Sequence, residues 1–169
     1  WPQAESADEL HDALGWLGLL TAQEVQRQPA WAPLLDELMR DKRVTRVDPA
    51  DGADNAGFIV AAQRLPEFTA VHPGARVLPP IAVPVEFAKT WSREDALVEI
   101  VRGRLEGLGP TTAAELAASI AAPVASIDAA LLALEGEGFV MRGSFTPQAG
   151  AEWCERRLLA RITRYTVNR

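Results

Sequence analysis

Three arginines near the end of the chain repeat at helical spacing. Arg157, Arg161 and Arg164 follow the pattern i, i+4, i+7, so on a helix they form one row. A guanidinium group presents a fork of donors that matches the oxygens of a phosphate. The row therefore predicts a surface that binds the backbone of a nucleic acid. The alternative is that the same arginines pair with acidic groups of a neighbouring domain or of the rest of this chain.

The charge distribution supports a local basic surface. The chain has 169 residues with 17 basic and 23 acidic side chains, a net charge of −6, which by itself argues against nucleic-acid binding. Residues 140–169 nevertheless hold six arginines against two glutamates, a charge of +4, which leaves −10 on the rest. For a phosphate backbone such a patch matters more than the total.

The candidate DNA-binding residues are cations, together with two aromatic side chains that could stack on unpaired bases. Core packing is the alternative for the aromatic rings. For the first-half cations, the alternative is a solvated helix end where they complement exposed carbonyls. The candidates are Arg43, Arg46, Arg142, Trp153, Arg156, Arg157, Arg161, Arg164 and Tyr165.

Catalytic and metal-binding patterns are absent from the sequence. His11 and His72 lie far apart with no Cys or carboxylate at ligand spacing, and Cys154 is expected on an apolar helical stripe, where a thiol acts as a small hydrophobe. We expect no catalytic residue, metal or cofactor in this segment. A single cysteine and the lack of a long apolar run predict a cytoplasmic protein without a membrane span. Trp1 at the start and a helical pattern at the end indicate a piece of a longer protein.

An internal repeat organises the chain. Residues 17–25 resemble residues 108–116, and residues 35–44 resemble residues 131–140. Each copy reads as a helix, a second helix opened by a Thr-x-x-Glu capping box at Thr21 or Thr112, a third helix and a strand. A strand, loop and strand after three helices is typical of a winged helix-turn-helix.

The predicted fold is mainly α with small β wings, as tandem winged helix-turn-helix domains. Residues 1–64 form the first domain, with wing strands at 43–48 and 57–61, and residues 92–150 form the second, with a wing at 143–150. Residues 65–91 form a linker in which five prolines forbid a helix, although its apolar residues predict that it packs on a domain surface. Residues 151–169 form a basic amphipathic helix that starts near Ala151.

The third helix of the second copy is unsuited to reading bases. Residues 124–135 place alanines, Ser126, Asp128 and Glu135 on the outer face and contain no Lys or Arg. Major-groove recognition calls for Arg, Lys, Asn or Gln there, and phosphates repel carboxylates. The small residues favour packing against another domain.

Two segments carry a resemblance to a known family. Residues 138–146 and 152–166 look like the C-terminal region of the Lhr (large helicase-related) family of bacterial ATP-dependent DNA helicases, and residues 10–14, 63–66 and 102–112 extend the likeness over nearly the whole chain. Gln63 stands where the family usually has Glu, and Thr163 where it usually has His.

The resemblance implies a translocase that moves 3′ to 5′ on single-stranded DNA and takes part in DNA repair. The motor motifs are absent from this segment, which has no G-x-x-x-x-G-K-[ST], so ATP and Mg would bind only in the parent protein's motor. The implied partners are single-stranded or tailed duplex DNA and other domains of the same polypeptide.

Two other functions stay open. Gln26, Arg27 and Gln28 are similar to the Gln-x-Gln element of winged-helix DNA glycosylases, which excise damaged bases. A module used only for protein–protein assembly, which touches no nucleic acid, is the other alternative.

Overall fold

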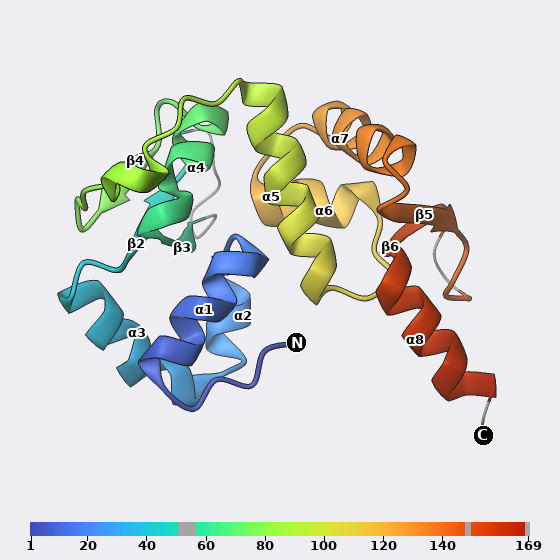
Figure 1. The fold of residues 1–169 in the computed structure, drawn as a ribbon, viewed down its shortest axis with the longest axis horizontal. Coiled ribbons are helices and arrows are strands. Elements are labelled where there is room, and N and C mark those ends of the chain that lie inside the picture. Colours follow the sequence, from blue (N-terminus) through green and yellow to red (C-terminus); the bar gives the residue numbers. More distant parts are fainter. Residues whose placement is uncertain (51–56, 148–149, 168–169) are drawn as a thin grey trace.

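The computed structural model describes residues 1–50, 57–147 and 150–167, with only the backbone of 165–167. It is mostly helical with two small antiparallel sheets, so the predicted α+β class is confirmed. The two halves of the chain form the two sides of an arch, and helix α5 lies between them (Figure 1). The predicted wings include residues 51–56 and 148–149, which lie outside the described residues.

The first half contains three helices followed by a strand pair. Ser6 begins the first helix by accepting the N–H of Glu9, and the predicted capping box of Thr21 and Glu24 opens the second. Pro29 starts a short 3₁₀ turn before the third helix. The elements are α1 (Ala7–Leu17), β1 (Leu20–Thr21), α2 (Ala22–Gln26), η1 (Pro29–Trp31), α3 (Ala32–Arg40), β2 (Val44–Asp48) and β3 (Phe58–Ala61).

The proline-rich segment is packed, as expected, but the prediction that it contains no helix is wrong. Helix α4 (Leu65–Val71) follows a 3₁₀ turn, η2 (Ala62–Arg64), and has Pro66 in its first turn, where no N–H is needed. Strand β4 (Arg76–Leu78) pairs with β2 and completes a sheet of order β1-β3-β2-β4. A last 3₁₀ turn, η3 (Val85–Phe87), leads to the second half. The segment is thus part of the first half's sheet and core.

The second half repeats the element order of the first. In each half the segment before the capping box pairs with the last strand, Leu20 with Ile59 in one and Thr111 with Trp153 in the other. The capping box at Thr112 is present as predicted. The elements are α5 (Arg93–Gly107), α6 (Ala113–Ile120), α7 (Val124–Gly136), β5 (Val140–Gly143), β6 (Glu152–Glu155) and α8 (Arg156–Val167).

The last helix begins five residues later than predicted. Residues 152–155 form β6 and pair with β5, and both Trp153 and Cys154 are buried. Glu155 ends the strand because its carboxylate accepts the N–H groups of Arg157 and Leu158, at 2.8 and 2.7 Å, and so caps α8. The apolar period that predicted a helix from Ala151 runs across this cap.

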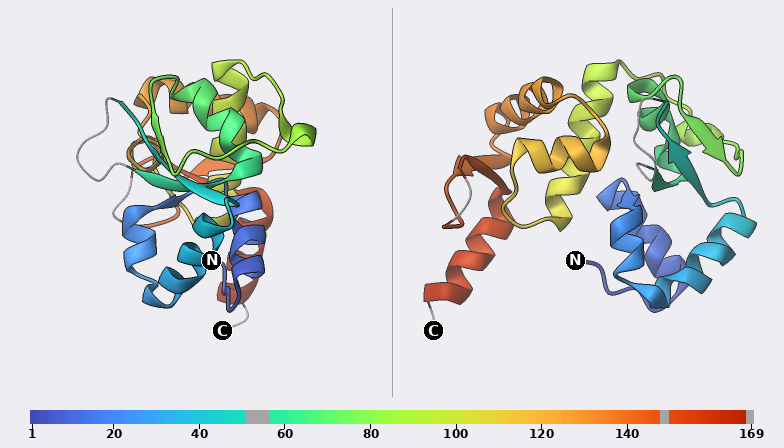
Figure 2. Two further views of the ribbon diagram at one scale, coloured as in Figure 1. Left: turned by 90° about the vertical axis from the view of Figure 1, so that its left-hand side faces the viewer. Right: turned by 180° about the vertical axis from the view of Figure 1, so that it is seen from behind.

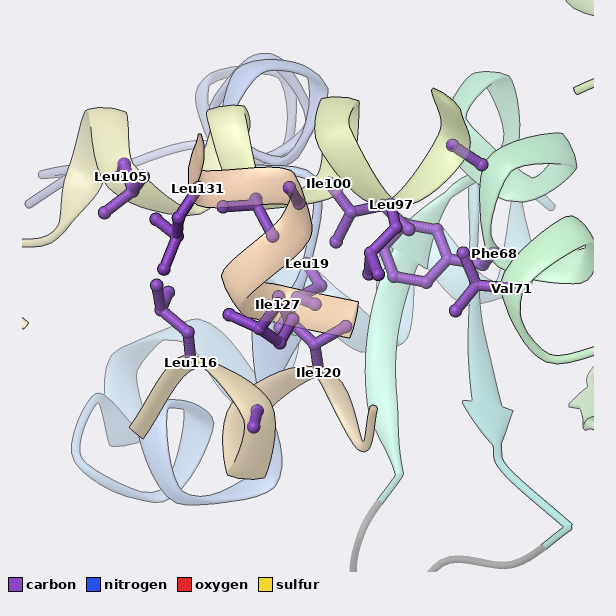
Figure 3. Packing of buried hydrophobic residues seen from close by; sticks show 14 of the residues in the cluster. Leu19, Phe68, Val71, Leu97, Ile100, Leu105, Leu116, Ile120, Ile127 and Leu131 are labelled. Atoms are coloured by element: carbon purple, nitrogen blue, oxygen red, sulfur yellow. The ribbon is translucent and has the colours of Figure 1, made fainter. Parts of the chain in front are cut away.

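One hydrophobic core crosses both halves. Leu19, Phe68 and Val71 of the first half belong to the same buried cluster as residues of α5, α6 and α7, as the close-up in Figure 3 shows. A smaller cluster lies between α1 and α3 and includes Trp31 and Leu38. Because the larger core is shared, the two halves bury apolar surface against each other and pack as one body.

Helices α1 and α5 approach closely at two glycines. A Cβ atom on Gly103 would lie 2.6 Å from the carbonyl oxygen of Trp16 and 3.0 Å from that of Leu17, and one on Gly107 would overlap the Leu17 side chain. Only glycine permits this contact.

Arg104, between those glycines, forms a buried ion pair across the halves. The residue is 1% exposed, and its guanidinium donates to the Leu19 carbonyl at 3.1 Å and to Glu24 at 2.6 Å. The same Glu24 accepts the N–H of Thr21 in the capping box at 2.8 Å. One carboxylate therefore caps α2 and neutralises a cation of α5. We call the contact made by Gly103, Arg104, Gly107 and Glu24 the α5 seam.

The ion pair yields a prediction with a matched control. Glu24→Gln leaves a buried guanidinium without a counterion, so we expect the free energy of unfolding to fall by about 3 kcal/mol in urea titrations. Glu115 has the same capping role in α6 but forms no ion pair with a described residue, and Glu115→Gln should cost less than about 1 kcal/mol. Equal losses in the two variants would contradict a stabilising role for the pair with Arg104.

The close helix contact yields a second prediction. Alanine is favoured over glycine inside a helix by about 1 kcal/mol, yet Gly103→Ala should lower the melting temperature because its Cβ meets backbone atoms of α1. Gly136→Ala in α7 is the control, since a Cβ there has no neighbour within 4 Å, and it should raise the melting temperature slightly. A stabilised Gly103→Ala variant would show that the seam is not tightly packed.

Candidate nucleic-acid interface

Helix α8 projects from the second half and carries the predicted arginine row. It leaves the body directly after β6 and points away from it, as Figure 1 and the right-hand view of Figure 2 show. Arg157, Arg161 and Arg164 are all exposed. None of the three forms a salt bridge with another described residue. The row is therefore accessible to an anionic partner.

Two further candidate arginines lie where the β5–β6 strand pair meets this helix. Arg156 is the exposed first residue of α8. Arg142 is exposed on β5, opposite Trp153 in the strand pair, with its guanidinium 5.7 Å from the centre of the Trp153 ring. The structure thus brings five arginines of β5 and α8 onto adjoining elements. We call these five residues the arginine ridge: Arg142, Arg156, Arg157, Arg161 and Arg164.

The aromatic candidates fare differently from the arginines. Trp153 is only 4% exposed and belongs to the shared core, so its ring is not available to stack on a base, and the alternative of core packing is the one observed. The side chain of Tyr165 lies outside the described residues. Cys154 lies in β6 and not on a helical stripe, and burial, followed by the nearby charges of Glu155 and Glu152, raises the pKa of its thiol. It acts as a small core residue.

The two candidate cations of the first half, Arg43 and Arg46, form ion pairs within the molecule. Arg43 pairs with Asp8, and Arg46 pairs with Asp48 at 2.6 Å. Asp48 also accepts Arg76 at 3.3 Å, and although burial opposes it, these two arginines hold the pKa of Asp48 below its ordinary value. This edge of the sheet is therefore largely neutralised by its own acids.

Two buried glutamates, which sequence reasoning missed, fix the position of the ridge. Glu152 is 2% exposed and accepts the N–H groups of Phe145 and Thr146, each at 2.7 Å, and the Thr146 hydroxyl at 2.9 Å. Glu155 caps α8 as described above. The only signal in the sequence was an acidic residue directly before a basic helical repeat, the composition expected at a helix start.

The exposed face of α7 is as predicted. Asp128 and Glu135 are exposed among alanines, and Leu132 is 57% exposed. The helix is therefore a poor partner for phosphates but a plausible protein contact.

Among the described residues, no group of three or more His, Cys, Asp and Glu side chains is placed to hold a metal ion. His72 instead joins the two halves, because its Nε2 lies 2.9 Å from the Ile120 carbonyl, and burial lowers its pKa.

No single helix in the described part of the chain is long and apolar enough to cross a membrane. Only α6 and α7 taken together reach that length and composition, and they are bent by 114° at their break.

The Gln-x-Gln motif of residues 26–28 lies beside a small cavity. Gln28 lines a space of about 280 Å³ with Trp1 and Arg27, and Glu24, which also lines it, is paired with Arg104.

Compared with known proteins, the chain matches no protein-family model and no curated protein.

The hydrogen bonds to Glu152 predict that the stability of the fold depends on pH. Although burial opposes it, the hydrogen bonds from Thr146 and Phe145 hold the pKa of Glu152 below its ordinary value of 4.5. A carboxyl whose pKa is lower when folded contributes its full stability above 4.5 and loses it as the pH falls below that value. Urea titrations between about pH 5 and pH 2 should therefore show a weaker loss of stability in Glu152→Gln than in the parent chain. Identical pH profiles would contradict this.

Proposed function

We propose that the chain is a tandem pair of winged-helix units that binds the sugar–phosphate backbone of DNA through the arginine ridge. The observation that carries the proposal is the contrast among the described arginines. The five of the ridge are exposed, form no ion pair with described residues and lie together on the adjoining elements β5 and α8. In the first half, Arg43, Arg46 and Arg76 each pair with an acid, and the exposed Arg27 and Arg40 lie singly at the ends of α2 and α3.

The winged-helix assignment is supported by the repeated order of helix, paired segment, capped helix, third helix and two strands. Backbone binding, and not base reading, is supported by the third helix α7, whose sequence holds no Lys or Arg. The row from Arg157 to Arg164 spans about 10 Å of helix, enough to contact successive phosphates. Binding of this kind tolerates any sequence and weakens with salt.

The resemblance of residues 138–146 and 152–166 to Lhr helicases supports a place in a larger enzyme. In that setting the chain is a non-motor segment that holds or guides DNA during 3′ to 5′ translocation in DNA repair, while ATP and Mg bind to the motor. Single-stranded or tailed duplex DNA and neighbouring domains of the same polypeptide are the partners. The segment itself supplies contacts and no catalytic group.

The ridge can be tested by the salt dependence of DNA binding. Each phosphate contact on a single strand contributes about 0.7 to the slope of log affinity against log salt. Replacing Arg157, Arg161 and Arg164 together by Gln should therefore reduce the slope by about two units, measured by fluorescence anisotropy with an oligothymidylate.

The control removes the same number of charges elsewhere. Arg43→Gln, Arg46→Gln and Arg76→Gln together take away three arginines that are paired within the chain, and the slope should stay within about half a unit of the parent's. Circular dichroism checks that both triple variants are folded. If the two variants have the same slope, the ridge is not the DNA-binding surface.

A further inference from the structure

A groove of about 490 Å³ lies between the start of α5 and the outer face of α7. Most of its apolar lining residues are alanines of α7. A groove lined by alanines lets a second helix approach closely, because no long side chain stands between the two backbones. The apolar lining residues are Leu97, Val98, Ala125, Ala129, Ala130 and Ala133.

The rim of this groove is acidic. Glu94 and Asp95, both exposed, line it from α5. Neither acid forms a salt bridge with another described residue. The one cation among the lining residues, Arg93, directs its Nε toward the Val71 carbonyl of the first half, at 3.5 Å. An apolar groove with such a rim is complementary to a helix with apolar residues beside a row of cations.

Helix α8 has this chemistry. On a helix, Leu158 and Ile162 lie on a face that adjoins the row of Arg157, Arg161 and Arg164. Leu158 is half-buried and Ile162 is 39% exposed. The helix is about 18 Å long, and the α7 residues that line the groove span about 12 Å, so α8 is long enough to cover the groove.

A chain cannot place α8 in its own groove. The groove lies at the first turns of α5, whereas α8 starts beside the opposite end of α5 and points away from the body (Figures 1 and 2). We propose that the α5–α7 groove binds helix α8 of a second copy of the chain, with the ridge arginines against Glu94 and Asp95. The contact uses different surfaces on the two copies, so it closes as a reciprocal pair or continues as a chain of copies.

This inference does not rest on DNA binding, because the contact forms between protein surfaces alone. It does set a relation between the two uses of α8. Arginines that pair with the acidic rim cannot hold phosphates at the same time, so DNA and the second copy compete.

Charge exchange in the absence of DNA tests the proposal. Sedimentation velocity of the parent chain at low salt should show species heavier than the monomer that dissociate as salt is added. The groove variant Glu94→Lys/Asp95→Lys and the helix variant Arg157→Glu/Arg161→Glu should each sediment as monomers, since like charges then oppose. An equimolar mixture of the two should associate again, because one variant offers a basic rim and the other an acidic helix.

A control variant carries the same charge change away from the groove. Asp36→Lys/Glu37→Lys alters two exposed acids of α3 and should associate as the parent does. If a charge-reversed variant is unfolded by circular dichroism, the milder pair Glu94→Gln/Asp95→Asn replaces it and should weaken association. A parent chain that is monomeric at low salt, or variants that associate like the parent, would overturn the proposal. Neither result bears on the DNA measurement.

Discussion

The buried ion pair between Arg104 and Glu24 is the interaction on which the rest of the arrangement depends. A guanidinium that is 1% exposed is tolerated because a carboxylate and a backbone carbonyl from the other half accept hydrogen bonds from its two terminal nitrogens, while its Nε has no partner among the described residues. Glu24 can serve because the capping box already holds its side chain at the start of α2. The same residue thus fixes the start of a helix in the first half and the position of α5 in the second.

The seam explains why the chain packs as one body and not as two linked domains. The glycines at 103 and 107 let α5 approach α1, and the apolar residues of α4 and α5 then share one core with the first sheet. Strand β6 then positions its two neighbours, because its Glu152 accepts the N–H of Phe145 after β5 and its Glu155 accepts the N–H of Leu158 in α8. The exposed arginines are therefore presented on a rigid support, which reduces the entropy lost when they bind a partner.

Much of this fold could be predicted from local sequence signals. The capping boxes at Thr21 and Thr112 and the repeat that contains them gave the helix starts, because a cap depends only on residues three positions apart. The α4 helix was missed because proline was treated as a breaker, although in the first turn of a helix it costs nothing. The start of α8 was misplaced because its apolar period continues through the buried strand β6.

In the candidate site, too, features set by local sequence could be predicted, whereas features set by distant residues could not. The arginine row follows from helical spacing and is exposed as expected, whereas the burial of Trp153 and the pairing of Arg43 and Arg46 depend on residues distant in sequence. The seam itself was unforeseeable for that reason, since Arg104 and Glu24 are 80 positions apart. Nothing in the local sequence indicates that an arginine flanked by glycines will be buried against a cap of the other half.

The central claim is that the two halves are fused through the α5 seam into one rigid body, and ¹⁵N relaxation of the backbone amides tests it most directly. Amides in α1 to β4 and amides in α5 to β6 should fit a single rotational diffusion tensor. Separate tensors for the two groups, each with the faster tumbling of a half-sized domain, would contradict the claim.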